Sequence, residues 1–287
     1  MKINYLFLIT LILFYSCNQN IKPAVNNLTS NSNRVSIEQS DLIFQNSKIF
    51  PNNTQFSISI IENGKIQFIG IKRENDTIFK TENHKNVFEI GSLTKIFTST
   101  ILSNFVIEKK IKLDDKINDY IKIPLKNNVE ISFKQLANHT SGLPKMPSNL
   151  EYLDKKNKFK DYNTSKLEEF LQNDLELSFT PGEQSSYSNI GVGILGYTLG
   201  KISNNNYQEL LNKYIFSKYG MNNTSTNRRT LSKKLIKGLN TNGQETSNWD
   251  LASLTPAGGI LSSVEDLSKF AVAQFNLQNK DLIFDKD

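Results

Sequence analysis

A serine and a lysine three residues apart stand where an apolar run meets a helical pattern, in the segment 88–95. Residues with this spacing share one face of a helix, so the Ser92 hydroxyl and the Lys95 amine can come within hydrogen-bonding distance. The positive helix end favours their deprotonated forms, and a partly neutral lysine can accept the serine proton. The spacing predicts an activated serine nucleophile that needs no histidine. A capping serine beside a solvated first-turn lysine would produce the same spacing.

A second polar cluster follows the turn at Pro181-Gly182, where Tyr187 and Asn189 precede another helical pattern. Side chains two residues apart at such a helix entry can point into one cavity. Tyr187 could share a proton with Lys95 and pass it to a leaving group, and Asn189 could hydrogen-bond a substrate amide. The cluster is informative only in combination with the first one.

The elements that would position these residues follow from the spacing of apolar side chains. Alternating apolar residues on both sides of Asn63-Gly64 predict a β-hairpin, because this dipeptide tolerates the positive φ angles of a type I′ turn. Capping boxes are expected at Ser132 and Ser165. Helical spacing predicts helices over 36–50, 95–110, 191–201, 207–216 and 264–275.

Length and charge limit the class of protein. The chain has 287 residues, 38% of them hydrophobic, which suffices for one large domain or two packed lobes. It carries 34 basic and 28 acidic residues, a formal net charge of +6, and the basic residues are scattered along the sequence. We therefore expect a solvated basic surface and no nucleic-acid partner.

The N-terminal segment is typical of a bacterial lipoprotein signal. A short basic start is followed by an apolar run over 3–14, too short to span a bilayer comfortably, and by Ser16 and Cys17. Cys17 is the only cysteine, so it has no disulfide partner within the chain. An ordinary secretory signal with an incidental cysteine is the alternative.

We expect residues 1–17 to be this signal with Cys17 as the lipidation site. Residues 18–35 are rich in Asn and Ser and are expected to form a flexible tether, and residues 36–287 the folded domain. The protein would then be anchored by lipid to a membrane of the bacterial cell envelope, on the periplasmic side or at the outer membrane.

In order and context, these motifs resemble the serine β-lactamase, penicillin-binding protein and class C-like esterase superfamily. Besides Ser92-x-x-Lys95 and Tyr187-Ser188-Asn189, the family's helix-end signature is matched by 136–144 and its later glycine turn and helix by 256–267. Tyr187, where class A enzymes have Ser-Asp-Asn, is typical of the class C-like branch. The resemblance, from about Phe56 to Phe275, implies an α+β fold (an α/β sandwich): an antiparallel sheet flanked by helices, with an all-helical lobe.

The resemblance also implies a serine hydrolase that cleaves an amide or ester: a β-lactam, a D-Ala-D-Ala peptide or a small ester. Ser92 would form the acyl-enzyme, Lys95 and Tyr187 would handle the proton, and Asn189 would position the substrate. Which of Lys95 and Tyr187 is the base stays open, because the two would titrate as a coupled pair. We expect no cofactor, a small-molecule or peptidoglycan-like acyl donor, and a monomer.

The sequence departs from the family pattern after Phe275, where the family's third motif, K-T-G or H-x-G, is not found in 276–287. That motif lies on a strand that supplies the second oxyanion donor, the first being the backbone N–H of Ser92. We expect the closing strands to be missing from this chain. The competing hypothesis is therefore a truncated remnant that is catalytically incompetent or only binds a ligand.

Other motifs have structural explanations. His139 lies in the helix-end signature, where we expect it to hydrogen-bond the turn rather than act as a base. With only two histidines, no metal site is predicted. Gly191-x-Gly193-x-x-Gly196 lacks the preceding strand of a dinucleotide fold, so we expect close helix packing. No G-x-S-x-G is present, which excludes an α/β-hydrolase triad.

Overall fold

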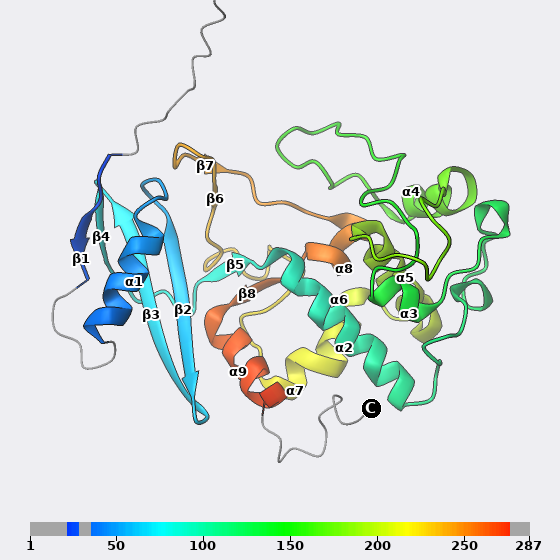
Figure 1. Ribbon diagram of the computed structural model, residues 1–287, viewed down its shortest axis with the longest axis horizontal. Coiled ribbons are helices and arrows are strands. Elements are labelled where there is room, and N and C mark those ends of the chain that lie inside the picture. Colours follow the sequence, from blue (N-terminus) through cyan, green and yellow to red (C-terminus); the bar gives the residue numbers. More distant parts are fainter. Residues whose placement is uncertain (1–21, 29–35, 276–287) are drawn as a thin grey trace, which may run out of the picture.

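A computed structural model describes residues 22–28 and 36–275, and it places a small sheet beside a larger helical part (Figure 1). The strands are β1 (Val25–Asn27), β2 (Gln55–Glu62), β3 (Lys65–Glu74), β4 (Thr77–Lys80), β5 (Val87–Glu89), β6 (Gly238–Leu239), β7 (Glu245–Thr246) and β8 (Leu261–Ser263). The α-helices are α1 (Ile37–Ser47), α2 (Thr94–Ile107), α3 (Phe133–Ala137), α4 (Thr164–Glu169), α5 (Asn189–Ser203), α6 (Tyr207–Leu211), α7 (Ser217–Tyr219), α8 (Thr255–Gly258) and α9 (Val264–Phe275).

The larger sheet has the strand order β1-β4-β3-β2, and the predicted hairpin supplies its β3 strand and its edge strand β2. Asn63 and Gly64 form the turn with φ angles of 49° and 73°, which confirms the prediction. Alternate residues of β3 and β4 point to one face and pack against apolar residues of α1. The buried residues of this small core are Leu28, Ile69, Ile71 and Ile78.

Part of the predicted tether belongs to the sheet. Strand β1 lies at the sheet edge and pairs in parallel with β4, so the sheet is not wholly antiparallel. Leu28 is buried in the small core, and the buried guanidinium of Arg73 donates a hydrogen bond of 2.7 Å to the Lys22 carbonyl. These long-range contacts hold a segment whose own sequence has no apolar periodicity. Residues 1–21, with Cys17 and the predicted signal, lie outside the described residues.

The helical part encloses the main core, and its helices follow the predicted spacing closely. Large side chains of α2, α3 and the turn after α4 fill the interior: Phe97, Phe105, Phe133 and Phe170. None of the helices within 22–28 and 36–275 is long and apolar enough to cross a membrane.

Of the two predicted capping boxes, one is confirmed and one is wrong. The Ser132 hydroxyl and the Gln135 side chain exchange hydrogen bonds with each other's backbone N–H at the start of α3. Helix α4 instead begins one residue before Ser165, because Asn163 is its cap and accepts from the Lys166 backbone N–H at 3.1 Å.

The glycines of 191–196 allow α5 and α8 to touch, as expected for close helix packing. A Cβ added at Gly196 would lie 2.2 Å from Cγ of Pro256 in α8, and one at Gly193 would lie 3.2 Å from Cδ2 of Leu254, the residue just before α8. Larger residues would separate the two helices. Their close contact fixes where the backbone of α8 lies.

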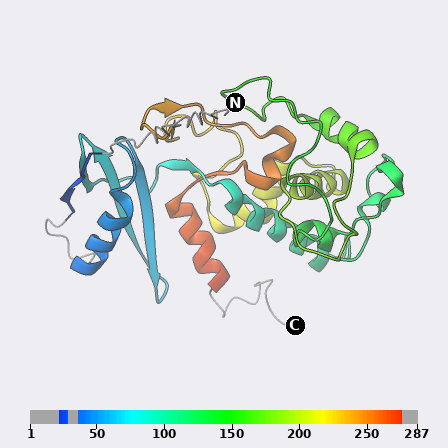
Figure 2. The same ribbon diagram turned by 45° about the horizontal axis from the view of Figure 1, so that its top comes forward.

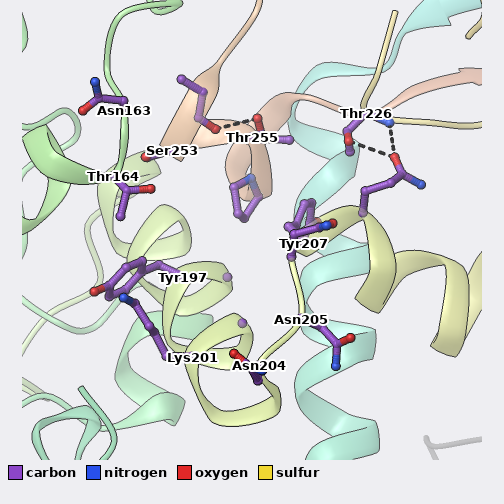
Figure 3. A pocket seen from close by; sticks show the side chains of 16 residues that line it. Asn163, Thr164, Tyr197, Lys201, Asn204, Asn205, Tyr207, Thr226, Ser253 and Thr255 are labelled. Carbon is purple, nitrogen blue, oxygen red and sulfur yellow. Dashed lines mark hydrogen bonds between the residues drawn. The ribbon is translucent and has the colours of Figure 1, made fainter. Parts of the chain in front are cut away.

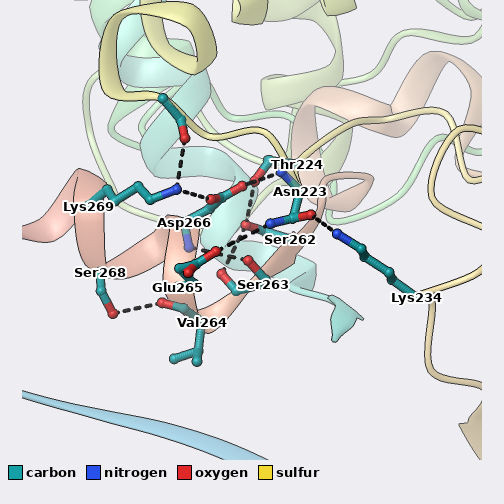
Figure 4. A network of polar contacts seen from close by, with 11 residues as sticks. Asn223, Thr224, Lys234, Ser262, Ser263, Val264, Glu265, Asp266, Ser268 and Lys269 are labelled. Carbon is teal, nitrogen blue, oxygen red and sulfur yellow. Dashed lines mark hydrogen bonds and ion pairs between the residues drawn. The ribbon is translucent and has the colours of Figure 1, made fainter. Parts of the chain in front are cut away.

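The two parts of the molecule meet around β5, β8 and α9. Strands β5 and β8 pair antiparallel, and α9 lies between the large sheet and the other helices (Figure 2). A buried polar network joins β8 and α9 to the segment 223–224 (Figure 4). The carboxylate of Asp266, at the start of α9, accepts from the Asn223 backbone N–H at 2.6 Å, from the Thr224 hydroxyl at 2.9 Å and from Lys269 at 2.8 Å. The Thr224 hydroxyl is also 2.8 Å from Oγ of Ser262 in β8.

We expect Asp266→Asn to lower the free energy of unfolding by about 3 kcal/mol, because an amide cannot replace both carboxylate oxygens as acceptors and leaves buried donors unpaired. Urea denaturation followed by circular dichroism measures this change. Glu130→Gln, which changes an exposed carboxylate to an amide, is the matched control. It should alter the free energy of unfolding by less than about 0.5 kcal/mol. Equal stabilities for the two variants would show that the network does not hold β8 and α9.

Candidate active site

The segment that carries Ser92 leaves β5 and enters α2 through a 3-10 turn, Gly91–Leu93. Gly91 has a φ of +53°, a conformation that glycine adopts readily. The Ile90 backbone N–H donates to the Ile260 carbonyl at 3.1 Å, and the Ile260 N–H donates to Oγ1 of Thr94 at 3.1 Å. These bonds tie the turn to the start of β8, and Ser92 itself is exposed.

Lys95, in the first turn of α2, reaches three acceptors from three separate segments. Its Nζ donates to Oγ of Ser92 at 3.3 Å, to Oδ1 of Asn189 at 2.8 Å and to the Ala257 carbonyl at 2.6 Å. The same nitrogen lies 4.7 Å from the centre of the Tyr187 ring. An ammonium group has three N–H donors, so this arrangement uses all of them.

The Tyr187-Ser188-Asn189 segment is held by its middle residue. The buried Ser188 hydroxyl donates to the Pro144 carbonyl at 2.7 Å and accepts from the Gly191 backbone N–H at 2.9 Å, which caps α5. The Asn189 backbone N–H donates to the Lys145 carbonyl at 2.9 Å. The flanking side chains of Tyr187 and Asn189 therefore point toward Ser92 and Lys95.

The Tyr187 hydroxyl lies 2.6 Å from Oγ of Ser92. Burial raises the pKa of the Tyr187 phenol, but the hydrogen bond to Ser92 and the positive charges of Lys95 and Lys145 outweigh burial, so the pKa lies below its usual value. A hydroxyl whose deprotonated form is favoured can accept the proton of a neighbouring serine. The arrangement is therefore suited to activating Ser92 as a nucleophile.

The structure brings together all four site residues that the sequence predicted in the folded domain: Ser92, Lys95, Tyr187 and Asn189. The fifth, Cys17, lies outside the described residues. Sequence reasoning missed the Ala257 carbonyl. A backbone acceptor carries no residue-type signal, and the glycine turn that follows it was the only hint.

His139 hydrogen-bonds the turn as predicted: its carbonyl accepts from the Ser186 backbone N–H and its Nδ1 from that of Ser188. In the described part of the chain, no three His, Cys, Asp or Glu side chains converge as metal ligands would.

A separate hollow of about 740 Å³ lies between α5, α6 and the segment 252–256. Its labelled side chains include Tyr197, Lys201 and Tyr207 (Figure 3), and none of the four predicted site residues lines it. The hydroxyl of the half-buried Tyr207 lies 2.6 Å from Oγ1 of Thr98, one turn along α2 from Lys95. This hollow is therefore distinct from the Ser92 site.

We expect the Tyr187 phenol to titrate below the usual tyrosine pKa of about 10, because Lys95 and Ser92 favour its phenolate. The difference in phenolate absorbance between the protein and its Tyr187→Phe variant isolates this one group from the ten tyrosines. Lys95→Met should raise the midpoint, since burial then acts with less opposition. A midpoint at or above the usual value, or one that Lys95→Met leaves unchanged, would contradict this electrostatic account.

This chain is similar to known proteins in both sequence and structure. The family model described as Beta-lactamase matches residues 57–284. "Beta-lactamase-like protein 4" of Dictyostelium discoideum is 31% identical over 244 residues, which cover 76% of this chain and 40% of that protein. A "Beta-lactamase" of Providencia stuartii is 29% identical over 230 residues, or 78% of this chain and 55% of the relative.

Among solved structures, "Beta-Lactamase/D-Alanine Carboxypeptidase from Pseudomonas syringae" superposes with a TM-score of 0.67 and 25% identity, covering 85% of this chain and 65% of that one. The expected β-lactamase/transpeptidase-like fold is thereby confirmed. The chain spans about half the length of the curated relatives it matches. Since the family model matches most of the sequence, the chain belongs to the Beta-lactamase family.

Proposed function

We propose that this protein is a serine hydrolase of the class C-like type, which cleaves an amide or ester bond through an acyl-Ser92 intermediate. The observation that carries the proposal is the position of Oγ of Ser92, 2.6 Å from the Tyr187 hydroxyl and 3.3 Å from Nζ of Lys95. A serine hydroxyl needs such a neighbour, because it is a weak nucleophile in its protonated form.

In the proposed acylation step, Oγ of Ser92 attacks the carbonyl carbon of the substrate and forms a C–O bond. The serine proton passes to the Tyr187–Lys95 pair, with the Tyr187 oxygen as the nearer acceptor. As the tetrahedral intermediate collapses, the bond to the leaving group breaks and the pair returns the proton to that group. Water then attacks the acyl-enzyme by the same route, which releases the acid and restores Ser92.

Asn189 is suited to holding the substrate. Its Oδ1 accepts from Lys95, while its Nδ2 donates at 3.3 Å to the thioether sulfur of Met146, a weak acceptor. A substrate amide carbonyl is a stronger acceptor and can replace the sulfur. Asn189 would then connect the position of the substrate to that of Lys95.

We place the reaction at the bacterial cell envelope, with a lipid on Cys17 as the anchor. The support is the N-terminal sequence pattern. A peptidoglycan-like D-Ala-D-Ala peptide, a β-lactam and a small ester are the proposed acyl donors, since all three offer a carbonyl to the same nucleophile. A steady-state comparison of the three classes would distinguish them.

Labelling with a fluorescent penicillin and with a fluorescent fluorophosphonate tests the proposal. We expect covalent label on the wild-type protein and none on Ser92→Ala. Ser148→Ala, which changes an exposed serine elsewhere, is the matched control and should label like wild type. Absence of label from folded wild-type protein with both probes would favour the ligand-binding hypothesis over the hydrolase.

We expect Tyr187→Phe to slow acylation of Ser92 by about a hundredfold or more, because the variant removes only the hydroxyl that can accept the serine proton. The measurement is the rate of label incorporation under excess probe. Tyr152→Phe alters another exposed tyrosine and should leave the rate within about twofold of wild type. A rate for Tyr187→Phe equal to that of this control would exclude Tyr187 from proton transfer.

A further inference from the structure

His139 holds the segment that carries Tyr187 at two points. Its backbone carbonyl accepts from the Ser186 N–H at 2.9 Å, and its Nδ1 accepts from the Ser188 N–H at 3.3 Å. The two donors stand on either side of Tyr187. His139 therefore fixes the backbone from which the Tyr187 side chain extends toward Ser92.

The imidazole also contacts Tyr187 directly. The two ring centres are 4.7 Å apart and the rings are tilted by 41°, a usual arrangement for an aromatic pair. His139 adopts a φ of +63°, which is uncommon for a residue with a side chain. This backbone conformation directs both the carbonyl and the ring of His139 toward the same short segment, residues 186–188.

The hydrogen bond to Ser188 depends on the protonation state of the ring. Nδ1 can accept only when it carries no proton, so the neutral tautomer with hydrogen on Nε2 is required. The ionisable groups around the ring are Tyr187 and Lys95, and Lys145 adds a further positive charge near Tyr187. Burial, and then the charge of Lys95, lower the pKa of His139 and so maintain the neutral form.

We propose that His139 is a positioning residue for catalysis: its neutral imidazole holds Tyr187 in line with Ser92, and protonation of Nδ1 at acid pH breaks the hydrogen bond to Ser188 and loosens this hold. This inference rests on the proposed hydrolase function. The geometry fixes the direction of the pH effect on acylation, because an imidazolium places an N–H opposite the Ser188 N–H and adds positive charge beside Lys95. Acylation of Ser92 should therefore decline as pH falls through the pKa of His139.

Two variants separate this role from simple filling of the turn. Asn and Gly both tolerate the positive φ of position 139, but only Asn offers an acceptor, Oδ1, at the place of Nδ1. His139→Asn should acylate Ser92 about tenfold faster than His139→Gly at alkaline pH, the effect of one retained hydrogen bond. Equal rates for the two folded variants would overturn the proposal.

The pH profile gives a second readout that packing alone would not change. His139→Asn has no titrating ring. The fall of its acylation rate on the acid side of the pH profile should therefore occur at lower pH than in wild type. A fall that stays at the wild-type pH would show that His139 protonation does not control Tyr187. Thermal melts by circular dichroism confirm that each variant is folded before its rate is compared.

A spectroscopic measurement tests the hydrogen bond from the Ser188 N–H to Nδ1 of His139 without any reaction. The chain has two histidines, so ¹⁵N-labelled histidine gives a simple spectrum, and His84→Gln assigns it. We expect His139 to show the Nε2–H tautomer and a midpoint below the usual histidine value. An Nδ1–H tautomer would overturn the proposed positioning role of His139. Absence of label on Ser92 with the Nε2–H tautomer present would instead contradict the proposed function.

Discussion

The site depends on the three hydrogen bonds that the ammonium group of Lys95 donates. The three acceptors come from the turn before α2, from the first residue of α5 and from α8, segments far apart in the sequence. A partly buried charge is tolerated only when its donors are satisfied. The side chain therefore requires all three segments to converge, and in doing so it brings Ser92 and Asn189 to one point.

The surrounding fold is arranged so that this convergence is possible. Small residues of α5 let Pro256 approach, and the next residue, Ala257, presents its carbonyl to Lys95. Strand β8 continues from there and pairs with β5, which leads into Ser92. The buried carboxylate of Asp266 holds β8 against the start of α9. Packing, strand pairing and a polar network thus each fix one side of the site.

Electrostatics at the site favours deprotonated neighbours of Ser92. Positive charge lowers the pKa of Tyr187 against the opposing effect of its partial burial, and burial together with the charge of Lys95 lowers that of His139. One cation therefore acts on two different residues in the same direction. The phenol becomes a better proton acceptor and the imidazole stays neutral, which is the form in which it can accept from Ser188.

Local signals predicted the elements and the reactive side chains, because both follow from residue type and short spacing. The turn at Asn63-Gly64 needs positive φ angles, and Ser92 and Lys95 share a helix face whatever surrounds them. Features made by distant contacts were missed. Strand β1 forms because β4 pairs with it and Arg73 hydrogen-bonds the Lys22 carbonyl shortly before it. The error at α4 was local, since Asn163 caps this helix although Ser165 has the box spacing.

The Ala257 carbonyl could not be found in this way, since any residue has a carbonyl and only the packing of α8 on α5 directs it. The same applies to the hydrogen bonds by which His139 holds the segment around Tyr187. The role of His139 depends on which backbone groups its ring and carbonyl meet, and those groups lie more than forty residues along the chain. Sequence spacing therefore identifies the reacting groups, whereas tertiary contacts determine how they are aimed.

Mass spectrometry of tryptic peptides after reaction with a fluorophosphonate tests the central claim most directly. If Ser92 is the activated nucleophile, the adduct lies on the peptide from Asn86 to Lys95 and fragments to Ser92. An adduct on any other peptide, or a folded protein with no adduct, would contradict the assignment of this site as an acyl-transfer centre.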